Sequence, residues 1–342
     1  MSAYVYILNP DGLLLSSDGA YGTDAGDASV WQRVDGKVVN AVSGRRLAAA
    51  DLADARLVAG PERLPSDHLA ELRGQGMTVI SNVMSPADIA TLKEKIAVER
   101  ARHHADESPT DGHFWISTGL LWAPELARAS SHPLALWLLR QYLDTQEIHY
   151  CHQPIITTLK PAGKLLGKHP RGGWHSDYPY HPGVFPDDNW PESPVLGAQF
   201  NVCIDPFTPE TAGTQFLPGS HRLCRGPSRE FNADGTRMGA GLHRDVRQIV
   251  ASAGAAVIYD ARTWHRACYE LNVSGHDRIA ILNAVAPAWV VPMIDKQPIT
   301  EAYRTAPVPA LLNQRERDEL ERLCHAPVLS RPPGMPELRG RG

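Results

Sequence analysis

A histidine and an aspartate stand one residue apart at His175 and Asp177. Side chains on a β-strand alternate between its two faces, so this spacing brings an imidazole and a carboxylate to the same side. A second imidazole from elsewhere in the chain would complete a face of two histidines and one carboxylate, an arrangement that suits ferrous iron and leaves coordination positions open. Alone the pattern is weak, because a surface histidine beside a solvated aspartate gives the same triplet.

Downstream segments supply the missing histidine and a cation. An apolar run at 255–259 leads through a short turn to His265, and Arg278 opens a second apolar strand at 278–285. A Pro-Gly-Ser-His segment at 218–221 lies between the His-x-Asp pair and this region. The planar guanidinium of an arginine matches a carboxylate in bidentate fashion.

Taken in this order, the segments resemble the phytanoyl-CoA dioxygenase family of Fe(II)/2-oxoglutarate oxygenases, over roughly residues 64–292. The resemblance implies that His175, Asp177 and His265 hold the iron and that Arg278 binds the far carboxylate of 2-oxoglutarate. It also implies O₂ as the oxidant, with ascorbate as a supporting reductant. In related halogenases a small residue replaces the aspartate, so Asp177 favours hydroxylation or another oxidation over chlorination.

The region after His265 departs from the family pattern. The spacing to Arg278 is longer than usual, and Ala267 stands where the family often has a hydroxyl residue. The other contacts of 2-oxoglutarate are therefore open. Thr158, on the strand before a Pro/Gly-rich loop, is a candidate, and Lys160 and Ser274 are further ones.

Five residues are candidates for contact with a substrate. Tyr178, Tyr180 and His181 follow the His-x-Asp pair and are expected at the mouth of the site, where aromatic rings either bind a substrate or only wall the cavity. Gln199 and Asn201 share one face of the strand at 195–205. That face is either the lumen of a barrel that holds a polar ligand or the solvated side of the sheet.

The order of elements predicts a mostly β fold with flanking helices: a double-stranded β-helix (jelly-roll, cupin-like) core and a small β-rich N-terminal appendage. Turn signals at 9–12 and 35–36 separate short strands near the N-terminus. Helices are expected at 65–76, from 86, at 132–143 and at 311–324, the last with its Arg/Glu face in solvent. The expected divisions are 1–60, 61–308 and 309–342.

Composition limits the class of protein. Of the 342 residues 43% are hydrophobic and 21% charged, and the net charge is −4, so no nucleic-acid footprint is expected. Neither a signal peptide nor a membrane-spanning run is recognised, and the five cysteines form no regular framework. We expect a cytoplasmic monomer or homodimer without membrane partners.

These features predict an Fe(II)/2-oxoglutarate-dependent dioxygenase that hydroxylates or otherwise oxidises a C–H bond of a small organic substrate and releases succinate and CO₂. A natural-product intermediate is favoured as substrate, because no basic cluster indicates a pocket for CoA phosphates. Two alternatives stay open: a non-catalytic binding protein on the same fold, and a cupin-like metalloenzyme that does not use 2-oxoglutarate.

Overall fold

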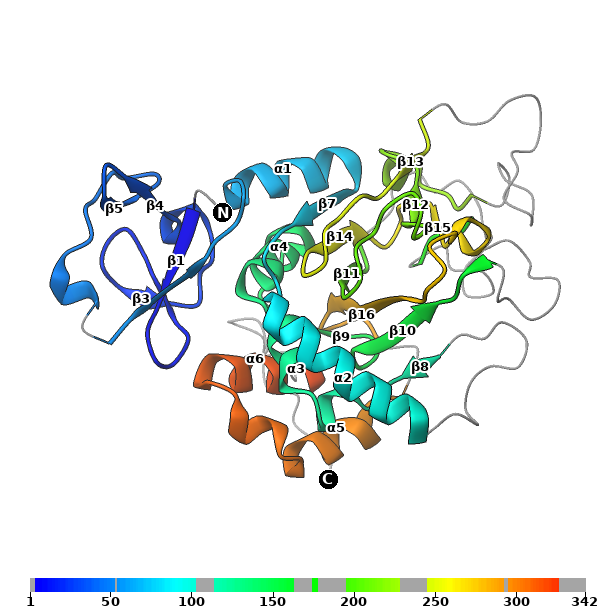
Figure 1. Ribbon diagram of the computed structural model, residues 1–342. Helices are drawn as coiled ribbons and strands as arrows, with labels where there is room; N and C mark the ends of the chain where they lie inside the picture. The colour runs from blue at the N-terminus through cyan, green and yellow to red at the C-terminus, as the bar shows by residue number, and fades with distance from the viewer. Residues whose placement is uncertain are drawn as a thin grey trace, which may run out of the picture.

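A computed structural model describes residues 4–52, 54–102, 114–162, 174–177, 195–227, 245–291 and 295–325 (Figure 1). The α-helices are α1 (Pro65–Gln75), α2 (Pro86–Arg102), α3 (Pro124–Ser130), α4 (Pro133–Leu143), α5 (Gln297–Thr305) and α6 (Gln314–Cys324). The strands are β1 (Tyr4–Leu8), β2 (Leu14–Leu15), β3 (Tyr21–Gly22), β4 (Trp31–Val34), β5 (Lys37–Asn40), β6 (Arg56–Ala59), β7 (Met77–Ile80), β8 (Trp115–Ile116), β9 (Ile148–Tyr150), β10 (Ile155–Leu159), β11 (Ala198–Cys203), β12 (Gln215–Phe216), β13 (Arg247–Gln248), β14 (Ala256–Asp260), β15 (His265–Arg266) and β16 (Arg278–Pro287).

Two antiparallel sheets form the core. The main sheet has seven strands in the order β7-β14-β11-β16-β10-β8, and β9 pairs with the end of β16. A small sheet runs β13-β12-β15, and a bridge between His175 and His265 adds the His-x-Asp segment at its edge. This pair of sheets confirms the predicted jelly-roll core with flanking helices.

The two faces of the main sheet pack against different partners. Ile156, Phe200 and Ile281 point to one side and pack with apolar residues of α1–α4 and α6 in the largest core cluster. On the other side Val257 and Ala280 pack with Phe216 of the small sheet. Because side chains alternate along each strand, every second residue of the central strands points into the space between the sheets.

The N-terminal region has its own six-stranded sheet, ordered β3-β2-β1-β4-β5 with β6 on the free side of β1. The predicted turns are present: Gly12 has a φ of 81°, and Asp35 and Gly36 have φ values of 48° and 75°, as a tight hairpin requires. Figure 1 shows this sheet as a separate lobe beside the main body. Arg315 of α6 donates its backbone N–H to the carbonyl of Asp11 at 3.0 Å and so ties the lobe to the core.

Helix α6 differs from the prediction. It begins at Gln314, because Asn313 and Glu316 form a capping box just before it, and Val308–Leu311 is a separate 3-10 helix. Its charged side chains are not all in solvent. Glu319 is buried and pairs with Arg140 of α4 at 2.5 Å, and these charges hold the helix to the core.

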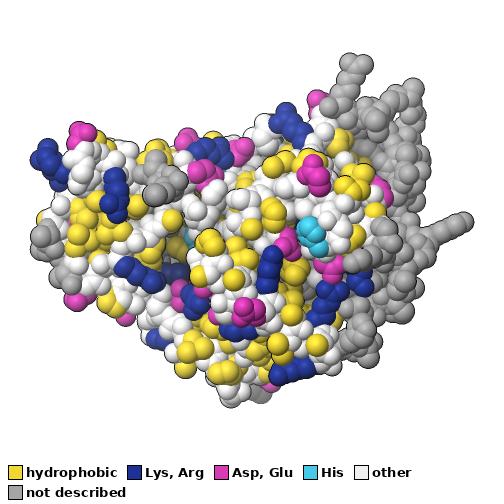
Figure 2. All heavy atoms as spheres, in the orientation of Figure 1, with side chains coloured by type: hydrophobic (Ala, Val, Ile, Leu, Met, Phe, Trp, Pro, Cys, Tyr) yellow, Lys and Arg dark blue, Asp and Glu magenta, His cyan; other side chains and the backbone are white. Residues whose placement is uncertain are grey.

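On the face shown in Figure 2, basic and acidic side chains are interspersed, and apolar side chains gather on the N-terminal lobe. Among the described helices, none is both long enough and apolar enough to cross a membrane.

Candidate metal and cosubstrate site

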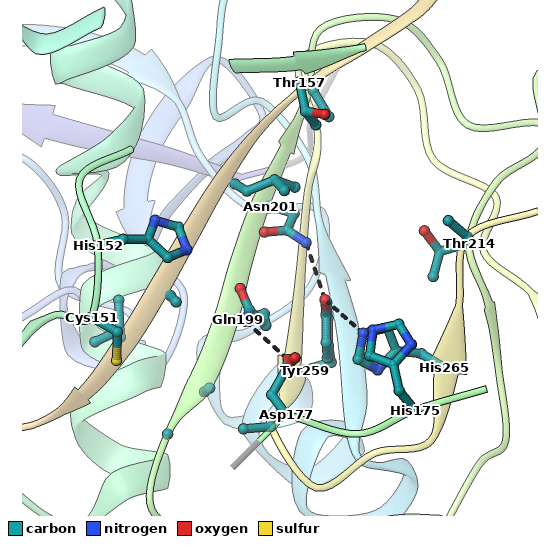
Figure 3. Close-up of a pocket in the computed structure, with 18 of the residues that line it drawn as sticks. Cys151, His152, Thr157, His175, Asp177, Gln199, Asn201, Thr214, Tyr259 and His265 are labelled. Atoms are coloured by element: carbon teal, nitrogen blue, oxygen red, sulfur yellow. Dashed lines mark hydrogen bonds between the residues drawn. The ribbon is translucent and has the colours of Figure 1, made fainter. Parts of the chain in front are cut away.

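A cavity of about 380 Å³ lies between the main sheet and the small sheet. Arg278, Ala280, Leu282 and Ala284 of β16 line it, since residues spaced by two on a strand share one face. Figure 3 shows that residues far apart in the sequence meet here: Gln199 and Asn201 from β11, Tyr259 from β14 and His265 from β15.

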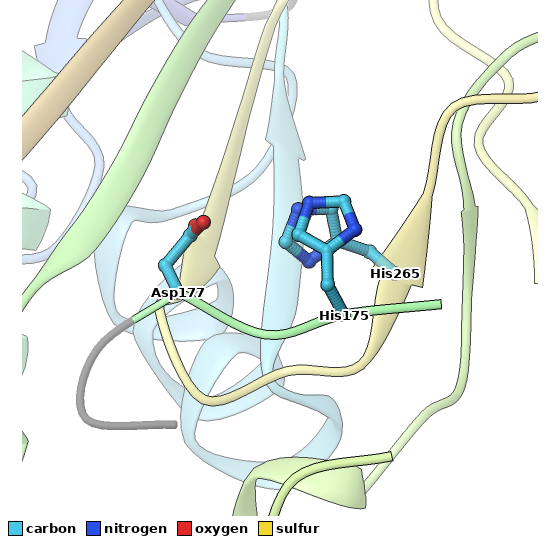
Figure 4. Close-up of side chains that lie close together, drawn as sticks. All are labelled: His175, Asp177 and His265. Atoms are coloured by element: carbon cyan, nitrogen blue, oxygen red, sulfur yellow. The ribbon is translucent and has the colours of Figure 1, made fainter. Parts of the chain in front are cut away.

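His175, Asp177 and His265 meet in this cavity, as the sequence predicted (Figure 4). His175 and His265 exchange two backbone hydrogen bonds of 3.0 and 2.9 Å, which brings their ring centroids to 4.3 Å. The backbone N–H of Asp177 donates to the carbonyl of Ala261 and places the carboxylate beside the rings. One ligand atom from each residue can be chosen so that all three lie within 4.8 Å of one another.

The turn that delivers His265 is held by buried polar contacts. Asp260, fully buried, accepts hydrogen bonds from Arg262 and from the hydroxyl of Tyr142 on α4. Thr263 donates its hydroxyl to the carbonyl of Gly76, at the end of α1, over 2.9 Å. The turn is therefore fixed to two helices before the chain reaches the distal imidazole.

The tautomer of His265 suits a metal ligand. Its Nδ1 lies 2.9 Å from the carbonyl oxygen of Thr263, which can only accept, so Nδ1 carries the proton and Nε2 has the lone pair. Burial, together with the neighbouring His175, lowers the pKa of His265 to about 4. The ring is therefore neutral at physiological pH, which metal binding requires.

Polar residues of β11 and β14 surround the triad. Gln199 donates its amide to Asp177 Oδ2 at 2.9 Å, and Asn201 donates to the hydroxyl of Tyr259 at 3.3 Å. That hydroxyl lies 3.5 Å from Nε2 of His265. Gln199 and Asn201 thus line the cavity, and the solvated-face alternative for this strand is wrong.

The donor set fits a ferrous ion. Two imidazoles and one carboxylate converge from one side of the cavity, and the other side is open space lined by β10 and β16. An amide orients the carboxylate and a backbone carbonyl orients one imidazole, the kind of outer contacts that metal ligands usually have.

Arg278 lies on the cavity wall, and only 7% of its surface is exposed. Its guanidinium donates to the carbonyl of Ala212 and stacks 4.0 Å from the ring centroid of Phe207. Thr158 also borders the cavity, but its hydroxyl accepts a hydrogen bond from the backbone N–H of Phe114. Thr157, which pairs with Ala280, shares the cavity face of the sheet (Figure 3).

The remaining candidate residues either do not line the cavity or lie outside the described residues. Ser274 bonds to Asn272 within its own turn, and neither Ser274 nor Lys160 lies among the cavity-lining residues. Tyr178, Tyr180 and His181 fall outside the described residues.

Cavity residues that sequence reasoning missed include Cys151, His152, Thr157, Thr214 and Tyr259. Only Tyr259 carried a signal. It stands two residues after Val257 on the apolar strand expected at 255–259, so alternation places the two side chains on the same face of that strand.

Comparison with known proteins identifies the family to which this chain belongs. The sequence profile of phytanoyl-CoA dioxygenase (PhyH) matches residues 72–280, more than half of the chain. Proteins of Mycobacterium bovis and Mycobacterium tuberculosis that carry no assigned function are each 32% identical over 101 residues. That match spans 30% of this chain and about a third (33%) of the length of each of those relatives.

Solved structures are similar at low identity. The epimerase SnoN, determined with Fe³⁺, α-ketoglutarate and nogalamycin RO, is 16% identical with a TM-score of 0.46 and covers 66% of this chain and 84% of its own. AviO1 from Streptomyces viridochromogenes Tue57 is 20% identical with a TM-score of 0.46, and the match covers 67% of this chain and 97% of AviO1. Similarities this distant assign no reaction to the chain.

The family match includes His175, Asp177, His265 and Arg278, the residues that meet at the cavity. The chain belongs to the phytanoyl-CoA dioxygenase family, whose cofactors are ferrous iron and 2-oxoglutarate, with O₂ as the oxidant.

Proposed function

We propose that the chain is an Fe(II)/2-oxoglutarate-dependent dioxygenase that hydroxylates a C–H bond of a small organic substrate and forms succinate and CO₂. The observation that supports this most is the convergence of His175, Asp177 and His265 on one cavity that also contains Arg278. An intact set of this kind is not needed by a protein that only binds.

His175, Asp177 and His265 are the proposed iron ligands, and Arg278 is the proposed partner of the far carboxylate of 2-oxoglutarate. A guanidinium on an apolar wall forms a strong pair with a carboxylate, because little water competes for either charge. Thr157 is a better candidate than Thr158 for a hydrogen bond to this carboxylate, because its side chain shares the cavity face of the sheet with Ala280. Among the residues that the structure describes, Lys160 and Ser274 do not line the cavity, so neither is proposed as a contact.

When bound, the iron and 2-oxoglutarate would supply the oxidising power for attack on a C–H bond. The protein residues orient and shield the reaction. Gln199 holds the carboxylate of Asp177 in place, and Thr263 fixes the ring of His265. The apolar side chains Leu159 and Leu282 line the cavity and limit water there.

We assign substrate contacts to Gln199 and Asn201, which face the cavity, and to Tyr178, Tyr180 and His181, which follow Asp177 in the chain.

We also propose that residues 1–60 are an appendage to the catalytic region 61–308, and that 309–342 forms a C-terminal segment. A separate sheet with its own apolar clusters supports the first division. Five unpaired cysteines support a reducing, cytoplasmic setting. We propose that the protein acts there as a monomer or homodimer.

Release of labelled CO₂ from 2-oxoglutarate tests the proposal. The wild type should release it only with both ferrous iron and O₂, and His175→Ala and Asp177→Ala should abolish the release while leaving the fold intact. His276→Ala, which removes an exposed histidine outside the cavity, is the matched control and should retain it. Release that survives either ligand substitution would refute the assignment.

Hydroxylation is tested separately from 2-oxoglutarate use. A screen of candidate substrates for stimulated succinate formation, followed by mass spectrometry, should find a product heavier by one oxygen atom. A product without added oxygen would replace hydroxylation with another oxidation.

A further inference from the structure

One wall of the cavity is formed by the short loop between β9 and β10, from which Cys151 and His152 line the space. Figure 3 shows the ring of His152 projecting into the cavity on the side opposite His175 and His265, with Gln199 between them in this view. No step of the proposed chemistry uses this histidine.

The loop is held rigidly in place. Cys151 donates its backbone N–H to the carbonyl of Ala284 at 2.8 Å, and Gln153 donates its amide to the carbonyl of Lys296. Lys296, itself only 6% exposed, donates Nζ to the carbonyl of Tyr150 at 2.7 Å. The backbone on both sides of His152 is therefore fixed, so its ring is presented to the cavity from a preorganised position.

One ring nitrogen of His152 is satisfied by the protein and the other faces the cavity. Nδ1 lies 2.7 Å from the carbonyl oxygen of Gln153, and because a carbonyl only accepts, Nδ1 carries the proton. Nε2 then has a lone pair and acts as an acceptor. Within the described ranges no protein group is hydrogen-bonded to Nε2. Burial lowers the pKa of His152, which keeps the ring neutral.

Space for a ligand lies beside this acceptor. The cavity wall near the loop is made of residues with little or no side chain, including Gly197, Ala261 and Ala284. Ala261 is also the residue whose carbonyl binds the backbone of Asp177, so the same wall leads to the proposed iron ligands. A molecule seated against it would have one end at His152 and another near the triad.

We propose that His152 is a substrate-binding residue whose Nε2 accepts a hydrogen bond from a hydroxyl group of the substrate, and that the substrate is therefore a small, neutral, hydroxyl-bearing molecule. A neutral acceptor on a wall of glycine and alanine favours a hydroxyl over an anionic group, which would place an oxygen lone pair against the lone pair of Nε2. The cavity volume, about 380 Å³, is at the small end of the roughly 300–1,000 Å³ typical of ligand pockets.

This inference rests on the proposed function, because the cavity is the same. Binding to metal-free protein separates the two, since it needs no turnover. The probes are two pairs of an alcohol and its methyl ether: phenol with anisole, and cyclohexanol with methoxycyclohexane. Ligand-observed NMR titrations would compare the wild type with His152→Leu, which has no acceptor, and with His152→Gln, whose amide oxygen retains one.

The wild type should bind each alcohol about 2- to 10-fold more tightly than its ether, the effect of one hydrogen bond. His152→Leu should lose that preference, and His152→Gln should recover part of it. Equal affinity for alcohol and ether in the wild type, no binding of either alcohol at millimolar concentration, or a preference that persists in His152→Leu would overturn the proposal. Labelled CO₂ release by the same proteins, measured after ferrous iron, 2-oxoglutarate and O₂ are added, reports on the proposed function independently.

Discussion

Gln199→Leu should weaken metal binding without touching a metal ligand. Gln199 Nε2 donates to Oδ2 of Asp177 at 2.9 Å, and leucine has similar bulk but no donor. A hydrogen bond to a charged acceptor contributes about 1.5–3 kcal/mol. Since about 1.4 kcal/mol is tenfold in an equilibrium constant, the dissociation constant for a divalent ion should rise about 10- to 100-fold, the range found for residues that orient metal ligands.

Anoxic titration with Co²⁺, a stand-in for Fe²⁺ that resists oxidation, measures this through the visible absorption of the bound ion. Thr214→Val is the matched control, because it removes a polar group from the same cavity while conserving volume. Its affinity should stay near that of the wild type. If Gln199→Leu bound the ion as tightly as the wild type, or if both variants lost affinity equally, the orientation of Asp177 by Gln199 would have no role in binding.

Three further changes test other parts of the site. Arg278→Gln should raise the KM for 2-oxoglutarate about 10- to 100-fold through loss of a charge-assisted pair, and an unchanged KM in succinate assays would remove Arg278 from the cosubstrate site. Gly76→Ala should lower the free energy of unfolding by about 1–3 kcal/mol, because φ is +83° and a Cβ would lie 2.5 Å from Oγ1 of Thr263. The melting temperature should fall with it, and a wild-type melting temperature would contradict this packing. Burial, and then the charge of Lys296, lowers the pKa of His149 to about 4. As the pH falls, His149 is protonated in the unfolded chain at a higher pH than in the folded protein. The free energy of unfolding should therefore fall between pH values of about 6.5 and about 4, by on the order of 3 kcal/mol. Urea unfolding of the wild type and His149→Gln checks this, and an equally steep fall in the variant would exclude His149 as the source.

The meeting of His175, Asp177 and His265 was predictable because its signals are local and periodic. Alternation in an extended segment predicts that the side chains of His175 and Asp177 share one face, and the distal histidine follows an apolar strand and a turn. The polar face of β11 was also visible in the sequence, although two interpretations fitted it. Only the pairing of β11 between β14 and β16 placed Gln199 and Asn201 on the cavity side.

Other features depended on contacts that no local pattern encodes. The threonines of β10 are adjacent, and the apolar residues before them do not fix which one faces the cavity; pairing with β16 does. The Arg/Glu pattern of α6 alone predicts a solvent-exposed face. Glu319 is instead paired with Arg140 of another helix, a contact that the pattern does not encode. His152 lies in a loop without periodicity, so its position follows only from the buried contacts that anchor that loop.

Anomalous diffraction at the iron edge, from crystals grown without oxygen in the presence of Fe²⁺ and 2-oxoglutarate, tests the central claim most directly. The account predicts one iron peak bonded to the imidazoles of His175 and His265 and the carboxylate of Asp177, with 2-oxoglutarate reaching from the metal to Arg278. An iron peak elsewhere in the molecule, or 2-oxoglutarate bound away from Arg278, would contradict it.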